Sequence, residues 1–392
     1  MKKLLQFEYG GCVIALAALT LTVAAWSYGA PLPLLNRALH DVRNDGPNDA
    51  ALGEQTRNYY EVLLKSGARR NLPAEPPKGF WRWLRGPRNM AEGWISLHRS
   101  GAMRGSDRFV VNELIPDKET LNKGVVIRAN RWGYRGPDWT REKPPGVIRI
   151  AFAGGSNVMG SGVAYEQGFV HQLQERLNRE RPAGADIRYE TLNFAIDGYF
   201  LPHNCYVIRE EMLPFQPDLI VLVSTMHDRQ HPVPLNLARM VANGQDLYFD
   251  CLKQLAARFD MRPTDSIGRL RRGWASVVDE MVQGLFDDLA EFSRDAKVPV
   301  AVFVLRLDPR SLHPSLPWIA GQAEQRGLPA LRGFDAYESR QPHEVYLNAA
   351  DFHPTTKAHE WIADELFDKM MANPIIHELL TPQTNEVTYG GQ

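Results

Sequence analysis

Three residues of this chain have the types and spacing that nucleophilic catalysis needs. Ser156 ends the sequence Gly154-Gly155-Ser156, and Asp351 and His353 stand two positions apart, just before Pro354. Hydrolytic acyl transfer uses a nucleophile, a base that takes its proton and a carboxylate that orients the base. It also uses donors for the oxyanion, which the backbone of Ser156, the backbone of Gly198 and the side chain of His227 could supply.

Predicted strands must bring these residues together. Residues 147–153 form an apolar run typical of a strand buried on both faces, and two glycines then permit a tight turn. Because open α/β sheets place their sites at the carboxyl ends of the strands, Ser156, Gly198 and His227 are expected at one edge. The predicted strands are 147–153, 188–195, 219–224, 298–305 and 332–337, and the predicted helices are 165–180, 201–213, 277–296 and 355–371.

The alternation of strands and helices predicts an α/β fold with a doubly wound parallel sheet and right-handed crossovers. Each candidate also has a purely structural interpretation. Ser156 could cap a helix, His353 could flank the last helix, and His227 could be structural. Asp228 is expected to bond loop amides.

A metal site or a nucleotide cofactor is not predicted. The histidines at 227, 231, 353 and 359 lack the glutamate of an H-E-x-x-H motif, and the loop after residue 153 lacks the G-x-G-x-x-G and Gly-Lys-Ser/Thr patterns.

These motifs together resemble the SGNH (GDSL) hydrolase family over about residues 146–372. Gly154-Gly155-Ser156 matches the Gly-Asp-Ser block, and Gly198 matches the glycine of the second block. Residues 225–228 match the Gly-x-Asn-Asp block, and Asp351 with His353-Pro354 matches the last block. The resemblance implies a flavodoxin-like sheet and an acyl-serine mechanism with Ser156 as nucleophile, His353 as base and Asp351 as its orienting partner.

The chain departs from the family pattern at positions that bear on the site. His227 replaces the oxyanion asparagine, and a neutral imidazole has only one N–H to donate. Asp351 lies two residues before His353, where three is the commonest spacing. Gly155 replaces the aspartate of the first block, which we interpret as a change of packing.

The chain is predicted to have four parts. Residues 1–35 form a signal anchor or a cleaved signal peptide, with an apolar stretch at 10–26 that enters the membrane. We favour an anchor with the rest of the chain outside the cytoplasm, in the periplasm or at the cell surface. Residues 36–145 form an accessory layer, 146–372 the main domain with an insertion at 229–273, and 373–392 a tail.

Composition and net charge limit the classes of partner that the chain is expected to bind. With a net charge of −1 over 392 residues, no global field favours nucleic acid. Cys205 and Cys251 lie in no disulfide-dense context, and a bond between them is not favoured. Tryptophans at 81, 83, 94 and 132 could stack on sugars, although core packing is the commoner role. Arginines at 258, 262, 269, 271 and 272 could form a lid or an anion-contacting rim.

The sequence therefore predicts an extracytoplasmic serine esterase or acyltransferase for a small acyl ester, such as an O-acetyl group of a carbohydrate. Water and a sugar hydroxyl remain alternative acceptors for the acyl group. The competing hypothesis is a degenerate, non-catalytic protein that binds glycan or assembles with partners.

Overall fold

The computed structural model describes residues 96–382, except for residues 111, 182–185, 231 and 349–350. The predicted membrane segment, residues 1–35, lies outside the described residues, as do the tryptophans at 81, 83 and 94. Within the described part, no helix combines the length and the apolarity that a membrane crossing requires.

Five parallel strands form the central sheet, in the order β6-β5-β7-β8-β9. This order is that of a flavodoxin-like doubly wound fold, as expected. Every residue of β5 is buried, which agrees with its apolar sequence. The strands are β5 (Val147–Ala153), β6 (Arg188–Asn193), β7 (Leu219–Ser224), β8 (Val300–Leu305) and β9 (Ala330–Gly333).

The last strand differs from the predicted range of 332–337. Strand β9 begins two residues earlier and ends at Gly333, which pairs with Leu305, the final residue of β8. The chain beyond Gly333 has no neighbouring strand to pair with, because β8 has already ended.

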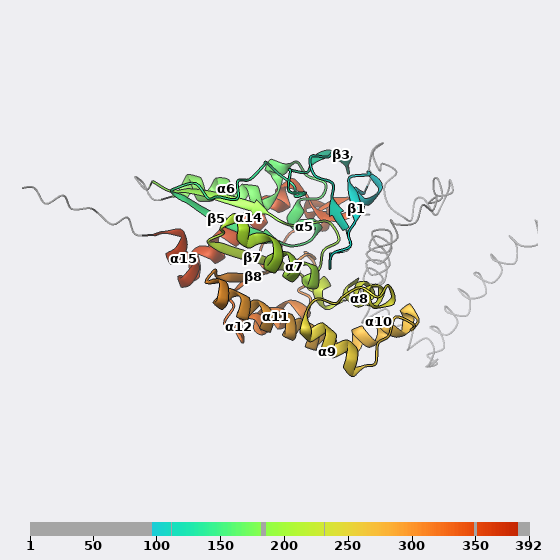
Figure 1. Ribbon diagram of the computed structural model, residues 1–392. Coiled ribbons are helices and arrows are strands. Elements are labelled where there is room, and N and C mark those ends of the chain that lie inside the picture. The colour runs from blue at the N-terminus through green and yellow to red at the C-terminus, as the bar shows by residue number, and fades with distance from the viewer. Residues whose placement is uncertain (1–95, 111, 182–185, 231, 349–350, 383–392) are drawn as a thin grey trace, which may run out of the picture. The chain divides into compact units, whose positions relative to one another are not determined.

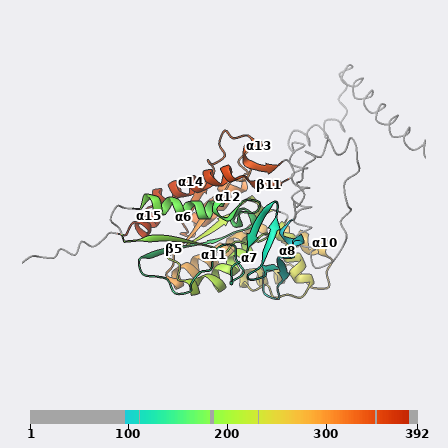
Figure 2. The same ribbon diagram turned by 90° about the horizontal axis from the view of Figure 1, so that it is seen from above.

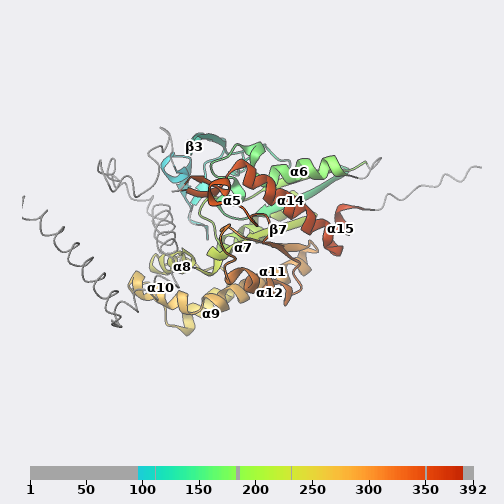
Figure 3. The ribbon, with the colours of Figure 1, turned by 180° about the vertical axis from the view of Figure 1, so that it is seen from behind.

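Helices cover both faces of the sheet (Figures 1 and 2). Helices α6 (Phe169–Glu180) and α14 (Thr356–Ala372) pack together on one face, and α6 contacts β6 while α14 contacts β9. Helices α7 (Leu201–Val207), α11 (Val278–Ala296) and α12 (Ser315–Glu324) lie on the other face, and the view from behind shows the same layers (Figure 3).

The predicted insertion consists of three helices, α8 (Pro232–Ala242), α9 (Asp250–Arg258) and α10 (Ile267–Ser276). Helix α10 packs on α8, and α9 packs on α11. Three of the arginines expected to form a rim are engaged by carboxylates: Arg258 pairs with Glu280, Arg262 with Asp260, and Arg269 with Asp265.

The accessory layer contributes two small hairpins. Strand β1 (Met103–Gly105) pairs with β2 (Asn112–Leu114), and β3 (Glu119–Asn122) pairs with β4 (Val125–Arg128). Short apolar runs predict strands at 109–111 and 125–127 in this layer. The second lies within β4, whereas Phe109 and Val110 lie in a bend. Phe109 is buried among Tyr206 and Phe249, so its apolar character serves packing.

The end of the described chain returns to the sheet. A short helix α13 (Pro342–Val345) leads into the hairpin of β10 (Tyr346–Asn348) and β11 (Asp351–Pro354), which precedes α14. Helix α15 (Pro374–Leu380) lies in the stretch predicted as a tail, and the Tyr189 hydroxyl donates to the Leu380 carbonyl. Cys205 and Cys251 are free thiols.

Candidate active site

Ser156 follows strand β5 and is the first residue of the short helix α5 (Ser156–Met159). Gly155 occupies the N-cap position, and the Ser156 side chain makes no capping hydrogen bond. Only 4% of Ser156 is exposed, and its hydroxyl has no hydrogen-bond partner among the described residues. The turn therefore holds a hydroxyl that is not used for local structure.

Arg135, which the sequence pattern did not single out, anchors the loop that follows this helix. Its guanidinium is 1% exposed and donates to the carbonyls of Met159, at 2.9 Å, and Val163, at 2.6 Å. Burial lowers the pKa of Arg135 to about 10. The buried cation thus satisfies the carbonyl of the last residue of α5 and that of Val163 in the loop that follows.

Asp351 and His353 lie together on β11. Residues two apart in a strand point to the same side, so the short spacing suits this pair. The Asp351 carboxylate lies against Nδ1 of the His353 ring and accepts the backbone N–H of His353 at 3.2 Å. Burial favours the neutral acid, but the attraction of His353 and of Lys123 outweighs it and holds the pKa of Asp351 below its usual range.

Lys123 is the second residue that sequence reasoning missed. Its Nζ lies 3.0 Å from Asp351 Oδ2 and 2.8 Å from His353 Nδ1, and only 3% of the residue is exposed. In the sequence it stands in Asn122-Lys123-Gly124, an ordinary hairpin turn. Such a turn gives no signal that its lysine reaches a histidine 230 positions further along the chain.

The predicted oxyanion donors surround a small hollow beside Ser156. Ser156, Gly198 and His227 line it together with Asn204, and its volume is about 20 Å³. The backbone N–H groups of Ser156 and Gly198 have no acceptor in the described part of the chain. Gly198 has a φ of 88°, a conformation that favours glycine. Two unused donors thus border a space large enough for about one water-sized group.

His227 lines the same hollow and is partly exposed. Burial, together with the nearby rings of His313 and His353, lowers the pKa of His227 to about 4, against the opposing effect of a hydrogen bond with Gln230. The imidazole is therefore neutral at neutral pH and has one N–H.

Helix α5 packs against β11, so the structure brings the serine and the Asp351–His353 pair into one region. Since the Ser156 hydroxyl has no partner among the described residues, the serine and the histidine are not hydrogen-bonded in this state. Catalytic hydrogen bonds often form only when substrate is bound.

Two neighbouring residues have structural roles. Asp228 accepts hydrogen bonds from the Leu201 N–H at 2.7 Å and the Ser224 hydroxyl at 2.7 Å, as expected for a residue that orders loops. His359 accepts the Phe169 N–H at 3.2 Å and stacks on the Phe169 ring. Among the described residues, no group of three His, Cys, Asp or Glu side chains could hold a metal ion.

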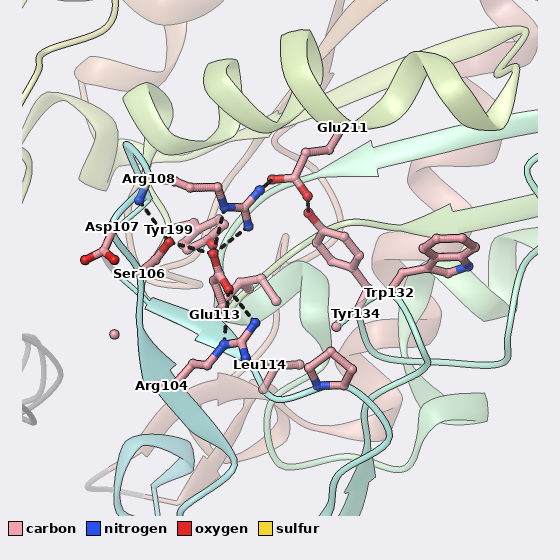
Figure 4. A pocket seen from close by; sticks show the side chains of 14 residues that line it. Arg104, Ser106, Asp107, Arg108, Glu113, Leu114, Trp132, Tyr134, Tyr199 and Glu211 are labelled. Carbon is pink, nitrogen blue, oxygen red and sulfur yellow. Dashed lines mark hydrogen bonds and ion pairs between the residues drawn. The ribbon is translucent and has the colours of Figure 1, made fainter.

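A larger hollow of about 510 Å³ adjoins the site through Tyr199, which lines both (Figure 4). Its arginines are engaged by carboxylates, with Arg104 and Arg108 both on Glu113. The ring of Trp132 contacts the guanidinium of Arg141 and the ring of Phe215. These contacts assign Trp132 to packing.

Comparisons with known proteins give structural matches only. No family model and no curated protein matches the chain. The chain is similar to TesA, with 16% identity, a TM-score of 0.35, and coverage of 57% of this chain and 98% of TesA.

Two further matches are esterases. A catalytic mutant of Axe2, an acetylxylan esterase from Geobacillus stearothermophilus, has 12% identity, a TM-score of 0.37, and coverage of 57% of this chain and 93% of that one. The acetyl xylan esterase AlAXEase has 14% identity, a TM-score of 0.35, and coverage of 56% and 98%. Because these TM-scores lie below 0.5, the similarity adds nothing to the argument from the geometry of the site.

Proposed function

We propose that the chain is a serine esterase or acyl-transfer enzyme of SGNH type, anchored in a membrane with its globular part outside the cytoplasm. The observation that carries the proposal is the arrangement at the carboxyl edge of the sheet. There an uncommitted Ser156 hydroxyl and two unused backbone N–H groups adjoin the strand that holds Asp351 and His353.

The chemistry follows from these positions. Ser156 Oγ attacks the carbonyl carbon of an ester, and His353 accepts the hydroxyl proton on Nε2, since Nδ1 faces Asp351. The N–H groups of Ser156 and Gly198 stabilise the oxyanion, with His227 as a third donor. His353 passes the proton to the leaving alcohol. The acyl-serine is then attacked by water or by a sugar hydroxyl, whose proton returns through His353 to Ser156.

The size of the hollow favours a small acyl group. A volume of about 20 Å³ matches a small group such as the methyl of an acetyl ester. O-acetyl groups of a carbohydrate are therefore the proposed substrate class, and the predicted location supports a polymer outside the cytoplasm.

The test uses the full chain and a fluorophosphonate probe. We expect the wild type to be labelled at Ser156, and Ser156→Ala and His353→Ala to lose labelling while still showing a cooperative unfolding transition. Glu175→Gln, a change at an exposed position of α6, is the control for the preparation of the variants. Hydrolysis of p-nitrophenyl acetate should exceed that of p-nitrophenyl octanoate by at least about tenfold.

A folded wild type that resists the probe and hydrolyses neither ester would contradict the proposal. It would favour the non-catalytic alternative, which glycan-binding measurements on the same protein would then examine. Addition of a sugar acceptor separates the two enzymatic possibilities, because a transferase forms the acetylated sugar and a hydrolase releases acetate.

A further inference from the structure

Lys123 has an unusual position for a lysine. It is the first residue of the two-residue turn that joins β3 to β4, where Lys123 has a φ of 49° and Gly124 a φ of 82°. Two positive φ values are the mark of a type I′ hairpin turn, which favours Asn, Asp or Gly at this place. A lysine in the left-handed region costs conformational free energy, and such positions gather at functional sites.

The environment of the ammonium is equally unusual. Lysine is almost never fully buried unless it is paired, and Lys123 is 3% exposed. Its Nζ lies 3.0 Å from Asp351 Oδ2 and 3.4 Å from Asp351 Oδ1, so it forms an ion pair with the carboxylate that orients His353. The same Nζ lies 2.8 Å from His353 Nδ1. The hairpin thus delivers a cation to both members of the pair.

Two groups therefore compete for one ring nitrogen. Nδ1 of His353 can donate to Asp351 only when it carries a proton, and it can accept from the Lys123 ammonium only when it does not. With the proton on Nδ1, Nε2 is free to take the proton of Ser156. With the proton on Nε2, the ring cannot act as the base. The ammonium also repels the imidazolium that forms during catalysis.

We propose that Lys123 is a positioning residue that sets the protonation and the tautomer of His353, through its ion pair with Asp351 and its contact with Nδ1. This inference rests on the proposed function, since it concerns the base of that mechanism. Lys123 and His353 both contact the Asp351 carboxylate, which would interact with His353 alone if the lysine were absent. The Lys123 Nζ contacts both the carboxylate and the ring nitrogen that the carboxylate faces.

The other histidines near His353 carry no positive charge at neutral pH that could replace that of Lys123. His227 from the segment 226–229 and His359 from α14 both lie close enough to influence or be influenced by His353. Burial lowers the pKa of His227 to about 4 and that of His359 to about 3, so both are neutral at neutral pH.

The charged side chains on the elements packed against β11 are exposed or have other partners. On α14, Asp364 and Asp368 pair with Arg176, Lys369 pairs with Asp335, and Glu365 accepts the N–H groups of Asp335 and Ala336. On α13, His343 is exposed, and Glu344 accepts the Gln341 N–H at 2.8 Å. On α14, Lys357 is exposed and paired with Glu360. Arg135 lies close enough to influence His359, and its guanidinium is committed to backbone carbonyls. Lys123 is the cation in direct contact with the ring among these described groups.

The first measurement needs no enzymatic activity. Full-length protein labelled with ¹³C at histidine Cε1 is titrated by NMR, and the His353 signal is identified by its loss in His353→Gln. In Lys123→Met we expect the titration midpoint of His353 to rise by about one pH unit or more, because a neighbouring cation no longer opposes the proton. Lys123→Arg, which keeps the charge, should stay closer to the wild type than Lys123→Met does.

Two variants make the result decisive. Lys123→Asn removes the charge and places a favoured residue in the turn, so it is expected to fold even where Lys123→Met does not, and it should show the same rise. Lys118→Met removes an exposed lysine that precedes the same hairpin and should leave the midpoint unchanged. An unchanged His353 midpoint in folded Lys123→Asn would overturn the inference.

The rate of fluorophosphonate labelling against pH provides the second readout. The acidic limb of this profile should move to higher pH in Lys123→Asn by the same amount as the NMR midpoint. Uniformly slower labelling with an unmoved limb and an unmoved midpoint would mean that Lys123 only supports the fold, and would refute the inference. Absence of labelling in every protein, with the NMR shift present, would overturn the proposed function and leave the coupling of Lys123 to His353 standing.

Discussion

At the scale of single residues, His227 is the substitution with the most direct bearing on rate. It lines the hollow beside Ser156, in the place where the resembled family has an asparagine amide. Because its pKa is about 4, the ring stays neutral through the range in which an esterase works, and its donor capacity does not change there. The ring therefore offers a constant, single N–H.

We expect His227→Ala to lower kcat by roughly 10²–10³, the usual cost of one oxyanion donor. His227→Asn restores an amide and should recover at least part of that loss. The measurement is kcat for p-nitrophenyl acetate at pH 7, with Gln172→Ala on α6 as a remote control. Wild-type kcat in His227→Ala would mean that the two backbone donors suffice.

Some residues of the candidate site could be predicted from the sequence, and others could not. Ser156 and His227 could be placed at one edge, because each follows a strand with a clear apolar run, and Gly198 could be placed there because it follows the strand predicted at 188–195. Lys123 and Arg135 could not be placed at the site, because each stands in a polar, turn-rich stretch that is typical of an exposed surface. Their burial arises from the packing of the accessory layer onto the sheet, and no local pattern encodes that contact.

At the scale of elements, the turn between β5 and α5 explains why position 155 holds a glycine. A Cβ at position 155 would lie 2.8 Å from the Tyr199 carbonyl oxygen, which belongs to the loop that carries Gly198. A backbone atom cannot move aside as a flexible side chain would. The strand ends have approached each other too closely for any side chain at this point, which fits the interpretation of Gly155 as a packing change.

We therefore expect Gly155→Asp, although it restores the family motif, to lower the free energy of unfolding by about 1–3 kcal/mol and to slow fluorophosphonate labelling. Urea denaturation and labelling rates measure the two effects. Gly321→Ala is the matched control, since a Cβ there meets no atom within 4 Å. Wild-type stability and labelling in Gly155→Asp would show that the loop carrying Tyr199 can move away from position 155.

Sequence patterns located the sheet elements well and their ends less well. The strands at 147–153 and 219–224 match the predicted ranges, because continuous apolar runs mark buried parallel strands. The start of β9 was displaced by two residues, since its register depends on where β8 ends. The three helices of the insertion lay in a stretch for which no elements were predicted.

At the scale of the whole molecule, buried neutral histidines should make stability depend on pH. Burial lowers the pKa of His203 and of His227 to about 4, and that of His359 to about 3, from an ordinary value near 6.5. The unfolded chain therefore binds more protons than the folded one between about pH 6.5 and pH 4. Stability is fully present above this window and is lost as the pH falls through it.

The expected loss is several kcal/mol between pH 7 and pH 4.5, at about 1.4 kcal/mol for each pH unit and each histidine within the window. Asp351, whose pKa is held low, contributes only below this range. Urea midpoints at pH 7, 5.5 and 4.5 give the dependence. His359→Gln, which can still accept the Phe169 N–H, should show a shallower slope. An equal slope in this variant would contradict the role of His359.

The hairpin that carries Lys123 has a consequence for the architecture of the protein. Residues 146–372 contain the sheet, the serine and the histidine, and they look like a portable module. Yet the ammonium on His353 and the guanidinium behind α5 both come from before residue 146. A chimaera that transplanted only 146–372 onto another leader would inherit the nucleophile and the base without their electrostatic partners. Under the proposed mechanism, the accessory layer is therefore expected to be part of the catalytic apparatus.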